Sequence, residues 1–177
     1  MIELKRLKRE LIFKGSIVDF YKDTIEMPNG NIVKWDHLAH RGAVAIVPVL
    51  SDGRIVLVRQ HRNSIDRIIW EIPAGGVEAS QESALEAARR ELLEEAGYDS
   101  KRLEHLLTIH TAVAFSDEVI EIYVAFDMIE GEQHLDENEF LEVAFFTYEE
   151  IKTMIFDGRI TDSKTISAIL AYGDKYL

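Results

Sequence analysis

The sequence has no cysteine, only three prolines and no long apolar run. A chain without cysteine forms no disulfides, which weakly favours a reducing compartment. No apolar stretch approaches the roughly 20 residues that span a bilayer, and the first residues, Met1 to Arg6, lack the apolar core of a signal peptide. We therefore expect a cytoplasmic protein with no membrane partner.

Basic residues are scarce as well. The chain has 20 lysines and arginines against 32 aspartates and glutamates, a formal net charge of -12. Nucleic acids are held mainly through lysine and arginine on their phosphates, so a general nucleic-acid partner is not expected. The excess of acid can serve solubility, or part of it can be gathered to hold divalent cations. The positions of the acidic residues along the chain decide between these two interpretations.

The rest of the composition is that of a globular protein, with 47% hydrophobic residues in a chain of 177. Short β-prone runs around a turn signal at Pro28–Asn31 predict a β-rich N-terminal region over residues 1–40. From 41 to 177 the mixed order of elements predicts a second domain, an α/β sandwich with a mixed sheet between helices. Its predicted strands are 42–50, 54–59, 68–72, 103–110, 118–126 and 140–147, and its predicted helices are 81–96, 148–156 and 163–172.

The helix predicted over 81–96 is the clearest element. Ser80 is expected as its N-cap and Gly97 as the residue that ends it. Apolar residues at helical spacing predict which side of the helix packs on the core. This apolar stripe comprises Leu85, Ala88, Leu92 and Ala96.

Carboxylates gather on one face of the same helix. Glu91 and Glu95 are four residues apart, and Glu94 borders their face. Like charges at this spacing repel, so a cluster beside a glycine-rich loop needs a counter-charge. Arg90 can supply part of it, and Mg²⁺ takes oxygen ligands of this kind while bridging to substrate phosphates. A bare Glu-x-x-Glu-Glu is more often a solvated helix face, so the surrounding residues decide.

Those residues form a longer pattern from Gly76 to Tyr98. It reads Gly, five residues, Glu82, seven residues, Arg-Glu-Leu, one residue, Glu-Glu, one residue, Gly-Tyr. A random window of average composition matches it with a probability of order 10⁻¹⁰, so chance does not explain it. The segment resembles the Nudix box, the signature of hydrolases that cleave a nucleoside diphosphate joined to another group. The resemblance implies a Nudix-type α/β/α sandwich over 41–177.

The resemblance also implies a metal site for Mg²⁺, with Mn²⁺ as an alternative. Arg90 and Glu82 would hold the carboxylates in place, and a backbone carbonyl before the box, at Gly75, would add a ligand. The loop from Gly75 to Glu82 is one residue longer than in many relatives, so the box glycine is either Gly75 or Gly76 and the carbonyl assignment can move by one. The implied metal-binding side chains are Glu91, Glu94 and Glu95.

The flanking residues resemble the ADP-ribose pyrophosphatase branch of the family. The resemblance rests on Arg59-Gln60-His61-Arg62, on Trp70–Gly75 and on the β-rich N-terminal region, which in that branch is exchanged within a dimer. It implies a homodimer that hydrolyses a nucleoside diphosphate sugar, first of all ADP-ribose to AMP and ribose 5-phosphate. Val113 stands where the branch commonly has proline. Another nucleotide sugar or dinucleotide, such as GDP-mannose or NADH, and a non-catalytic ADP-ribose sensor therefore stay open as alternatives.

In that branch a carboxylate of a late loop is the general base. The acidic loop 129–139 offers Glu139 as the first choice and Glu137 as the second, although either can be a solvated loop residue. Four further residues are candidates for substrate binding: arginines that can bind phosphate, a carboxylate expected to face ribose or an arginine, and a carboxylate at the start of a strand. They are Arg59, Arg62, Glu71 and Glu118.

Overall fold

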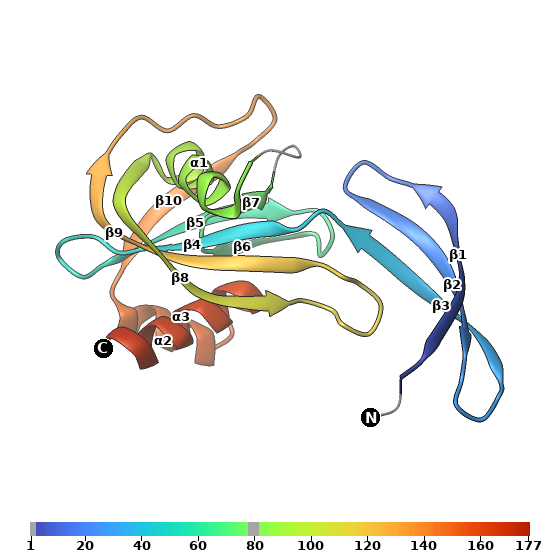
Figure 1. Ribbon diagram of the computed structural model, residues 1–177. Coiled ribbons are helices and arrows are strands. Elements are labelled where there is room, and N and C mark those ends of the chain that lie inside the picture. Colours follow the sequence, from blue (N-terminus) through green and yellow to red (C-terminus); the bar gives the residue numbers. More distant parts are fainter. Residues whose placement is uncertain (1–2, 78–81) are drawn as a thin grey trace. The chain divides into compact units, whose positions relative to one another are not determined.

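The computed structural model describes residues 3–77 and 82–177 (Figure 1). The chain divides into two compact units. The first contains the residues up to Gly42 together with His110–Val119, and the second contains Ala43–Ile109 and Ile120–Leu177. No helix within the described ranges is long and apolar enough to cross a membrane.

The first unit is built on an antiparallel sheet of three strands, in the order β1 (Lys5–Lys14), β2 (Val18–Glu26) and β3 (Ile32–His40). The predicted turn between β2 and β3 is confirmed: Gly30 has a φ of 83°, and its N–H donates to the carbonyl of Met27 at 2.8 Å. A glycine suits this position because L side chains rarely adopt such a φ.

The second unit holds the remaining elements of the described chain, in two sheets and three helices. One sheet has the order β7-β4-β9-β8, with β4 antiparallel to β7 and parallel to β9, so the predicted mixed sheet is confirmed. The other has the order β10-β5-β6. The bounds are β4 (Ala43–Pro48), β5 (Ile55–Arg62), β6 (Arg67–Glu71), β7 (Ala74–Gly76), α1 (Ala84–Ala96), β8 (Tyr98–His110), β9 (Val119–Glu130), β10 (Leu141–Phe146), α2 (Tyr148–Phe156) and α3 (Ser163–Tyr176).

Strand β4 shows why this unit is a sandwich. Successive side chains of a strand point to opposite faces. Ala45 and Val47 pack in a core cluster with residues of α2 and α3, whereas Val44 and Ile46 pack in a second cluster with residues of α1. The sheets therefore lie between α1 on one side and α2 with α3 on the other (Figure 1), as the predicted α/β/α sandwich requires. All four side chains are buried because both faces are covered.

Helix α1 departs from the prediction at its start. It begins at Ala84 with Ser83 as N-cap, whereas we expected a helix from Gln81 with Ser80 as N-cap. Ser80 and Gln81 lie outside the described residues. Ser83 forms the cap because Glu86 stands three residues later and completes a capping box. The predicted end at Gly97 is confirmed, with a left-handed φ of 72°.

The prediction of the apolar stripe of α1 was wrong for one residue. Leu85 is 47% exposed, and Ala87 is buried instead. The rest of the stripe is buried as predicted, but Glu91 and Glu95 lie on the same buried side. The helix therefore presents two carboxylates to the interior of the unit together with its small apolar residues.

Candidate active site

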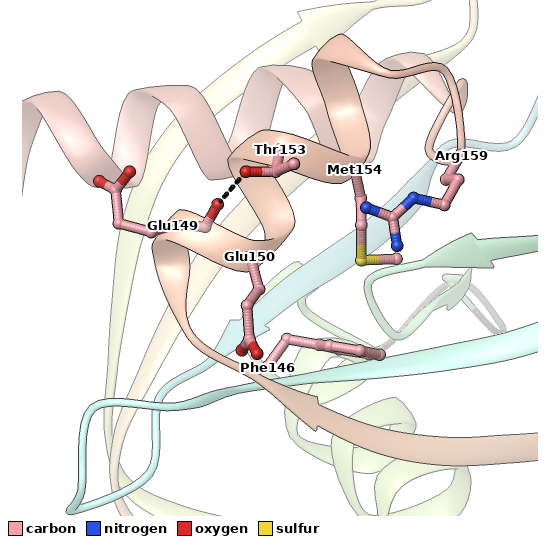
Figure 2. A pocket seen from close by; sticks show the side chains of 6 residues that line it. All are labelled: Phe146, Glu149, Glu150, Thr153, Met154 and Arg159. Carbon is pink, nitrogen blue, oxygen red and sulfur yellow. Dashed lines mark hydrogen bonds between the residues drawn. The ribbon is translucent and has the colours of Figure 1, made fainter.

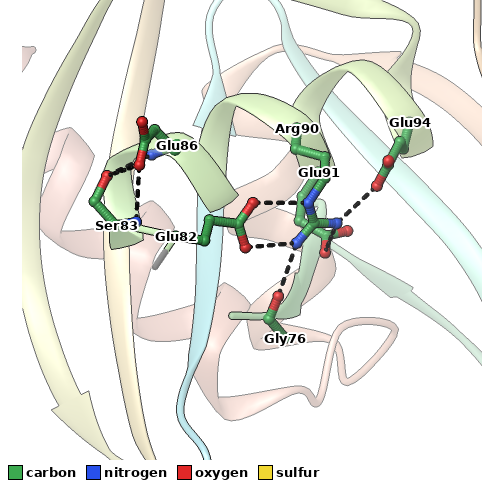
Figure 3. Close-up of polar contacts among 7 residues, drawn as sticks. All are labelled: Gly76, Glu82, Ser83, Glu86, Arg90, Glu91 and Glu94. Carbon is green, nitrogen blue, oxygen red and sulfur yellow. Dashed lines mark hydrogen bonds and ion pairs between the residues drawn. The ribbon is translucent and has the colours of Figure 1, made fainter. Parts of the chain in front are cut away.

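The two ends of α1 are held by local bonds that fix its carboxylates on a defined helix. At the start, the Glu86 N–H donates to the Ser83 hydroxyl at 3.3 Å, and the Ser83 N–H donates to the Glu86 carboxylate at 2.9 Å (Figure 3). At the end, the Gly97 N–H donates to the carbonyl of Leu93 at 3.0 Å. Both arrangements satisfy backbone groups that a helix end otherwise leaves unpaired.

Arg90 lies at the centre of the polar contacts (Figure 3). Its Nε donates to Glu82 Oε1 at 3.0 Å, and one terminal nitrogen donates to both Glu91 Oε1 at 2.7 Å and Glu94 Oε2 at 2.8 Å. The other terminal nitrogen donates to the Gly76 carbonyl at 3.0 Å. The hydrogen bonds with Glu82 hold the pKa of Arg90 above its ordinary value, so the guanidinium stays charged. One cation thus links the loop before the helix with two of its carboxylates.

Glu91 and Glu95 are unusual because they are buried, with exposed fractions of 8% and 3%. Burial, with a smaller contribution from the nearby charge of Glu139, raises the pKa of Glu91 to about 7 and that of Glu95 to about 8. Glu95 accepts a hydrogen bond from the Ala74 N–H at 2.9 Å. When these buried carboxyls lose their protons, the residues around them do not fully neutralise the negative charge, which is the electrostatic condition that favours a bound cation.

Gly75 on β7 packs directly against Glu91. A Cβ atom at Gly75 would lie 2.1 Å from the Glu91 carboxyl carbon and one of its oxygens, closer than any real contact. At Gly76, by contrast, a Cβ would meet nothing within 4 Å, and the carbonyl of this residue is already bonded to Arg90. The two glycines of the loop therefore have different roles: Gly75 makes room for a carboxylate, and Gly76 binds the arginine.

The donor set suits a hard divalent cation, since all its side-chain donors are carboxylate oxygens. In the part of the chain that the structure describes, no group of three acidic or histidine side chains already has the geometry to hold an ion. Arg90 binds one oxygen of Glu91 and one of Glu94. A metal ion would have to replace these bonds.

The structure separates the two candidate bases of the acidic loop. Glu139 is half-buried, and its N–H donates to the carbonyl of Asp136 at 2.9 Å. It lines a pocket of about 500 Å³ and lies close enough to Glu91 and Glu95 to affect their pKa values. Glu137 is exposed and does not line this pocket. The other lining residues are Gln60, His61, Asp136, Asn138 and Phe140.

The two candidate arginines differ in their surroundings. Arg59 is exposed, with its guanidinium 5.6 Å from the ring centre of Trp70 and 3.4 Å from Glu142, and it lines a pocket of about 370 Å³. Arg62 is half-buried, and its Nε donates to Glu71 Oε2 at 2.7 Å. The second oxygen of Glu71 binds Lys164. Of the two partners expected for Glu71, ribose or an arginine, the structure favours the arginine.

Lys164 is a residue that our sequence reasoning missed. It is the second residue of α3 after the N-cap Asp162, and it is almost fully buried. The positive end of a helix disfavours a cation, and the pairing of Lys164 with Asp162 and Glu71 offsets this effect. The sequence alone does not identify Glu71, 93 residues away, as the partner of this lysine.

Glu118 belongs to the first unit. It accepts a hydrogen bond from the Thr111 hydroxyl, and its other oxygen lies 3.5 Å from His40 Nε2.

A further pocket, of about 320 Å³, lies beside α2 (Figure 2) and contains none of the predicted site residues. Phe146 and Met154 supply its apolar wall, Glu150 and Arg159 line it, and the Thr153 hydroxyl donates to the carbonyl of Glu149 at 2.9 Å. Of the two pockets, only the one at Glu139 is lined by a predicted catalytic residue.

Comparison with known proteins agrees with the geometry. The model of the NUDIX domain matches residues 39–168. An ADP-ribose pyrophosphatase of Bacillus subtilis is 37% identical over 170 residues, covering 95% of this chain and 91% of the relative. A methanol dehydrogenase activator of Bacillus methanolicus is 38% identical over 96% of this chain and 92% of the relative. A crystal structure of an ADP compounds hydrolase has a TM-score of 0.86, with 23% identity, 97% of this chain and 93% of that chain covered.

Proposed function

Because this chain belongs to the Nudix hydrolase family, we propose that it hydrolyses ADP-ribose to AMP and ribose 5-phosphate. The single observation that carries the proposal is the pair of buried carboxylates, Glu91 and Glu95, packed against Gly75 beside the charged Arg90. The relative from Bacillus subtilis, named an ADP-ribose pyrophosphatase, supports the choice of substrate. GDP-mannose and NADH remain the alternatives to test.

Nudix hydrolases generally use a divalent metal, and we propose Mg²⁺, with Mn²⁺ able to replace it. Glu91, Glu94 and Glu95 would hold it, together with the carbonyl of Gly75. Gly75 is preferred over Gly76 because the Gly76 carbonyl already accepts a hydrogen bond from Arg90. When bound, the metal neutralises pyrophosphate charge and lowers the pKa of the attacking water. Before the metal binds, Arg90 keeps the carboxylates in position through its bonds with Glu91 and Glu94. Its bonds with Glu82 and the Gly76 carbonyl hold the arginine beside them when the metal replaces the first two.

Glu139 is the proposed general base. It takes a proton from the water that attacks one phosphorus, while the bond from that phosphorus to the bridging oxygen breaks. Its half-buried position in the 500 Å³ pocket supports this role over Glu137. We expect Glu139→Gln to lower kcat by about 10²- to 10⁴-fold. Glu137→Gln, the matched control on the same loop, should change kcat by less than about threefold. Equal losses in both variants would contradict the assignment.

Arg62 is the proposed phosphate-binding residue. Glu71 holds its Nε, whereas its two terminal nitrogens have no hydrogen-bond partner among the described residues. Terminal guanidinium nitrogens can bind two phosphate oxygens at once. Arg59 lines a different pocket, where it is proposed to balance negative charge of the substrate.

We also propose a homodimer in which the β-rich first unit, residues 1–40 in the predicted domain division, is exchanged between subunits. This unit leaves Leu11, Phe13 and Ile17 exposed, which is apolar surface that a second subunit could cover. Light scattering after gel filtration measures the mass directly, and a monomer at micromolar concentration would rule the dimer out. The cytoplasmic location stays a prediction.

A substrate panel tests the proposed reaction. Purified protein with Mg²⁺ is mixed separately with ADP-ribose, GDP-mannose and NADH, followed by alkaline phosphatase, which releases phosphate only from the monoester products. We expect the highest kcat/KM for ADP-ribose. Another substrate in first place would correct the substrate but keep the reaction. Binding of ADP-ribose without hydrolysis of any compound would favour a sensor.

A further inference from the structure

A chain of buried charges links α3 to the candidate site. Lys164 Nζ lies 2.5 Å from Glu71 Oε1 and 3.0 Å from Asp162 Oδ2. The other oxygen of Glu71 accepts from Arg62 Nε at 2.7 Å. Glu71 is only 2% exposed and Lys164 only 8% exposed. One buried carboxylate is thus shared by two cations that come from different elements of the second unit.

This arrangement is costly to build. Removing a lysine and a glutamate from water carries a desolvation penalty that their attraction often does not recover. Lys164 also stands in the first turn of α3, where the helix dipole repels it. Thr165 already joins α3 to the residue after β6, because its hydroxyl accepts the Ile72 N–H at 3.0 Å. The lysine is thus one of two polar contacts between α3 and this part of the chain.

The second cation changes what Arg62 can do. Arg62 binds one oxygen of Glu71, and Lys164 binds the other. Without the lysine, both oxygens of Glu71 would be free to bind the guanidinium, including a terminal nitrogen. Because Lys164 also pairs with Asp162, the two cations and two carboxylates balance, and the effect of Lys164 on Arg62 is one of orientation. Burial raises the pKa of Glu95, and the charge of Arg62 acts in the opposite direction, which places that charge within reach of the carboxylates of α1.

We propose that Lys164 is a positioning residue for Arg62. By binding one oxygen of Glu71, it fixes this carboxylate so that the other oxygen orients the guanidinium, with its terminal nitrogens directed to the pyrophosphate of the substrate. The proposal rests on the proposed function, in which Arg62 binds phosphate. It assigns Lys164 to substrate affinity and not to the chemical step.

The test compares Lys164→Met with Lys164→Arg and with Lys152→Met, which changes a partly exposed lysine of α2 that is paired with Glu149. In steady-state hydrolysis of ADP-ribose, we expect Lys164→Met to raise KM by about tenfold or more and to change kcat by less than about threefold. Lys164→Arg should recover most of the affinity, and Lys152→Met should leave KM within about twofold of wild type. A lower urea midpoint of Lys164→Met with an unchanged KM would overturn the proposal, because that result is expected if the lysine has a purely structural role.

A double-mutant cycle makes the test specific to Arg62. If Lys164 acts through Arg62, the KM of the double variant with Lys164→Met and Arg62→Met should be less than about twofold above the KM of Arg62→Met alone. Multiplicative effects would show that the two residues act separately and would overturn the proposal. If Lys164→Met does not fold, the double variant with Lys164→Met and Glu71→Gln removes both charges of the pair. A KM equal to that of wild type in this double variant would also overturn the proposal.

Titration calorimetry with inorganic pyrophosphate and Mg²⁺ separates this proposal from the proposed function. If the wild-type chain does not hydrolyse ADP-ribose, the proposed function fails, and the calorimetry still decides about Lys164. We expect Lys164→Met to weaken pyrophosphate binding by about tenfold relative to Lys152→Met. Equal affinity in these two variants would refute the positioning role whatever the substrate is.

Discussion

Replacing Glu95 with glutamine tests how the raised pKa of this buried carboxyl affects the stability of the protein. Burial raises the pKa of the Glu95 carboxyl from an ordinary 4.5 to about 8. Between these two values, the folded chain keeps a proton that the unfolded chain has released. Because the folded state binds more protons, the free energy of unfolding of the metal-free protein falls as the pH rises from about 4.5 to about 8.

The size of the effect follows from the same pKa values. One pKa unit corresponds to about 1.4 kcal/mol, so at pH 7.5 the ionisable Glu95 lowers the stability of the folded chain by about 4 kcal/mol. Glutamine keeps the oxygen that accepts from the Ala74 N–H, but its NH₂ group needs a partner of its own. We therefore expect Glu95→Gln to be more stable by about 2 to 4 kcal/mol in EDTA, a melting temperature higher by roughly 5 to 15 °C.

The assay is urea unfolding in EDTA at pH 4.5, 6 and 7.5. The gain should be below about 0.5 kcal/mol at pH 4.5 and grow with pH. Glu94→Gln is the matched control, since Glu94 is more exposed and bonded to Arg90, and it should show no gain. A Glu95→Gln protein that is less stable than wild type at pH 7.5, or a gain independent of pH, would refute the reasoning. With Mg²⁺ and ADP-ribose the same variant should lose orders of magnitude in turnover, and retention of more than about a tenth would sink the role of Glu95 as a metal ligand.

Two further predictions concern the packing around the site. Gly75→Ala should lower kcat by about 100-fold or more, because its Cβ collides with the Glu91 carboxylate; Gly76→Ala, with open space at its Cβ, is the control in the same assay and should keep at least about half of the activity. Thr165→Val should lower the free energy of unfolding by about 1 to 3 kcal/mol, because the buried Ile72 N–H loses its acceptor. An unchanged urea midpoint would contradict the second prediction, and Thr165→Ser should restore stability.

Local signals explain the part of the fold that could be predicted from the sequence. The bounds 148–156 predicted for α2 are those of the structure, because Thr147 and Glu150 form a capping box beside an apolar run. The end of α1 at Gly97 follows from the same kind of signal. Its start was misplaced because two serines compete there, and only Ser83 has a glutamate, Glu86, at the third helical position.

Non-local contacts explain what the sequence could not give. The spacing of Glu91 and Glu95 predicts that they share a face, but it does not predict that this face is buried, because apolar periodicity assigns carboxylates to solvent. The close approach of Gly75 to Glu91 and the pairing of Glu71 with Lys164 join residues 16 and 93 positions apart. No pattern within one element contains such distances.

The residues whose burial the sequence did not predict have one property in common. Glu91, Glu95, Glu71 and Lys164 are charged groups in the interior, where each lowers stability unless another charge compensates it. Arg90 compensates the exposed side of the α1 carboxylates, and Lys164 with Arg62 compensates Glu71, yet Glu95 keeps a raised pKa. Buried charge left incompletely neutralised has no benefit for folding. Such charge is useful only if a bound cation and an anionic substrate complete the charge balance of the site. The lower stability expected of the metal-free chain and its proposed activity therefore have the same physical cause.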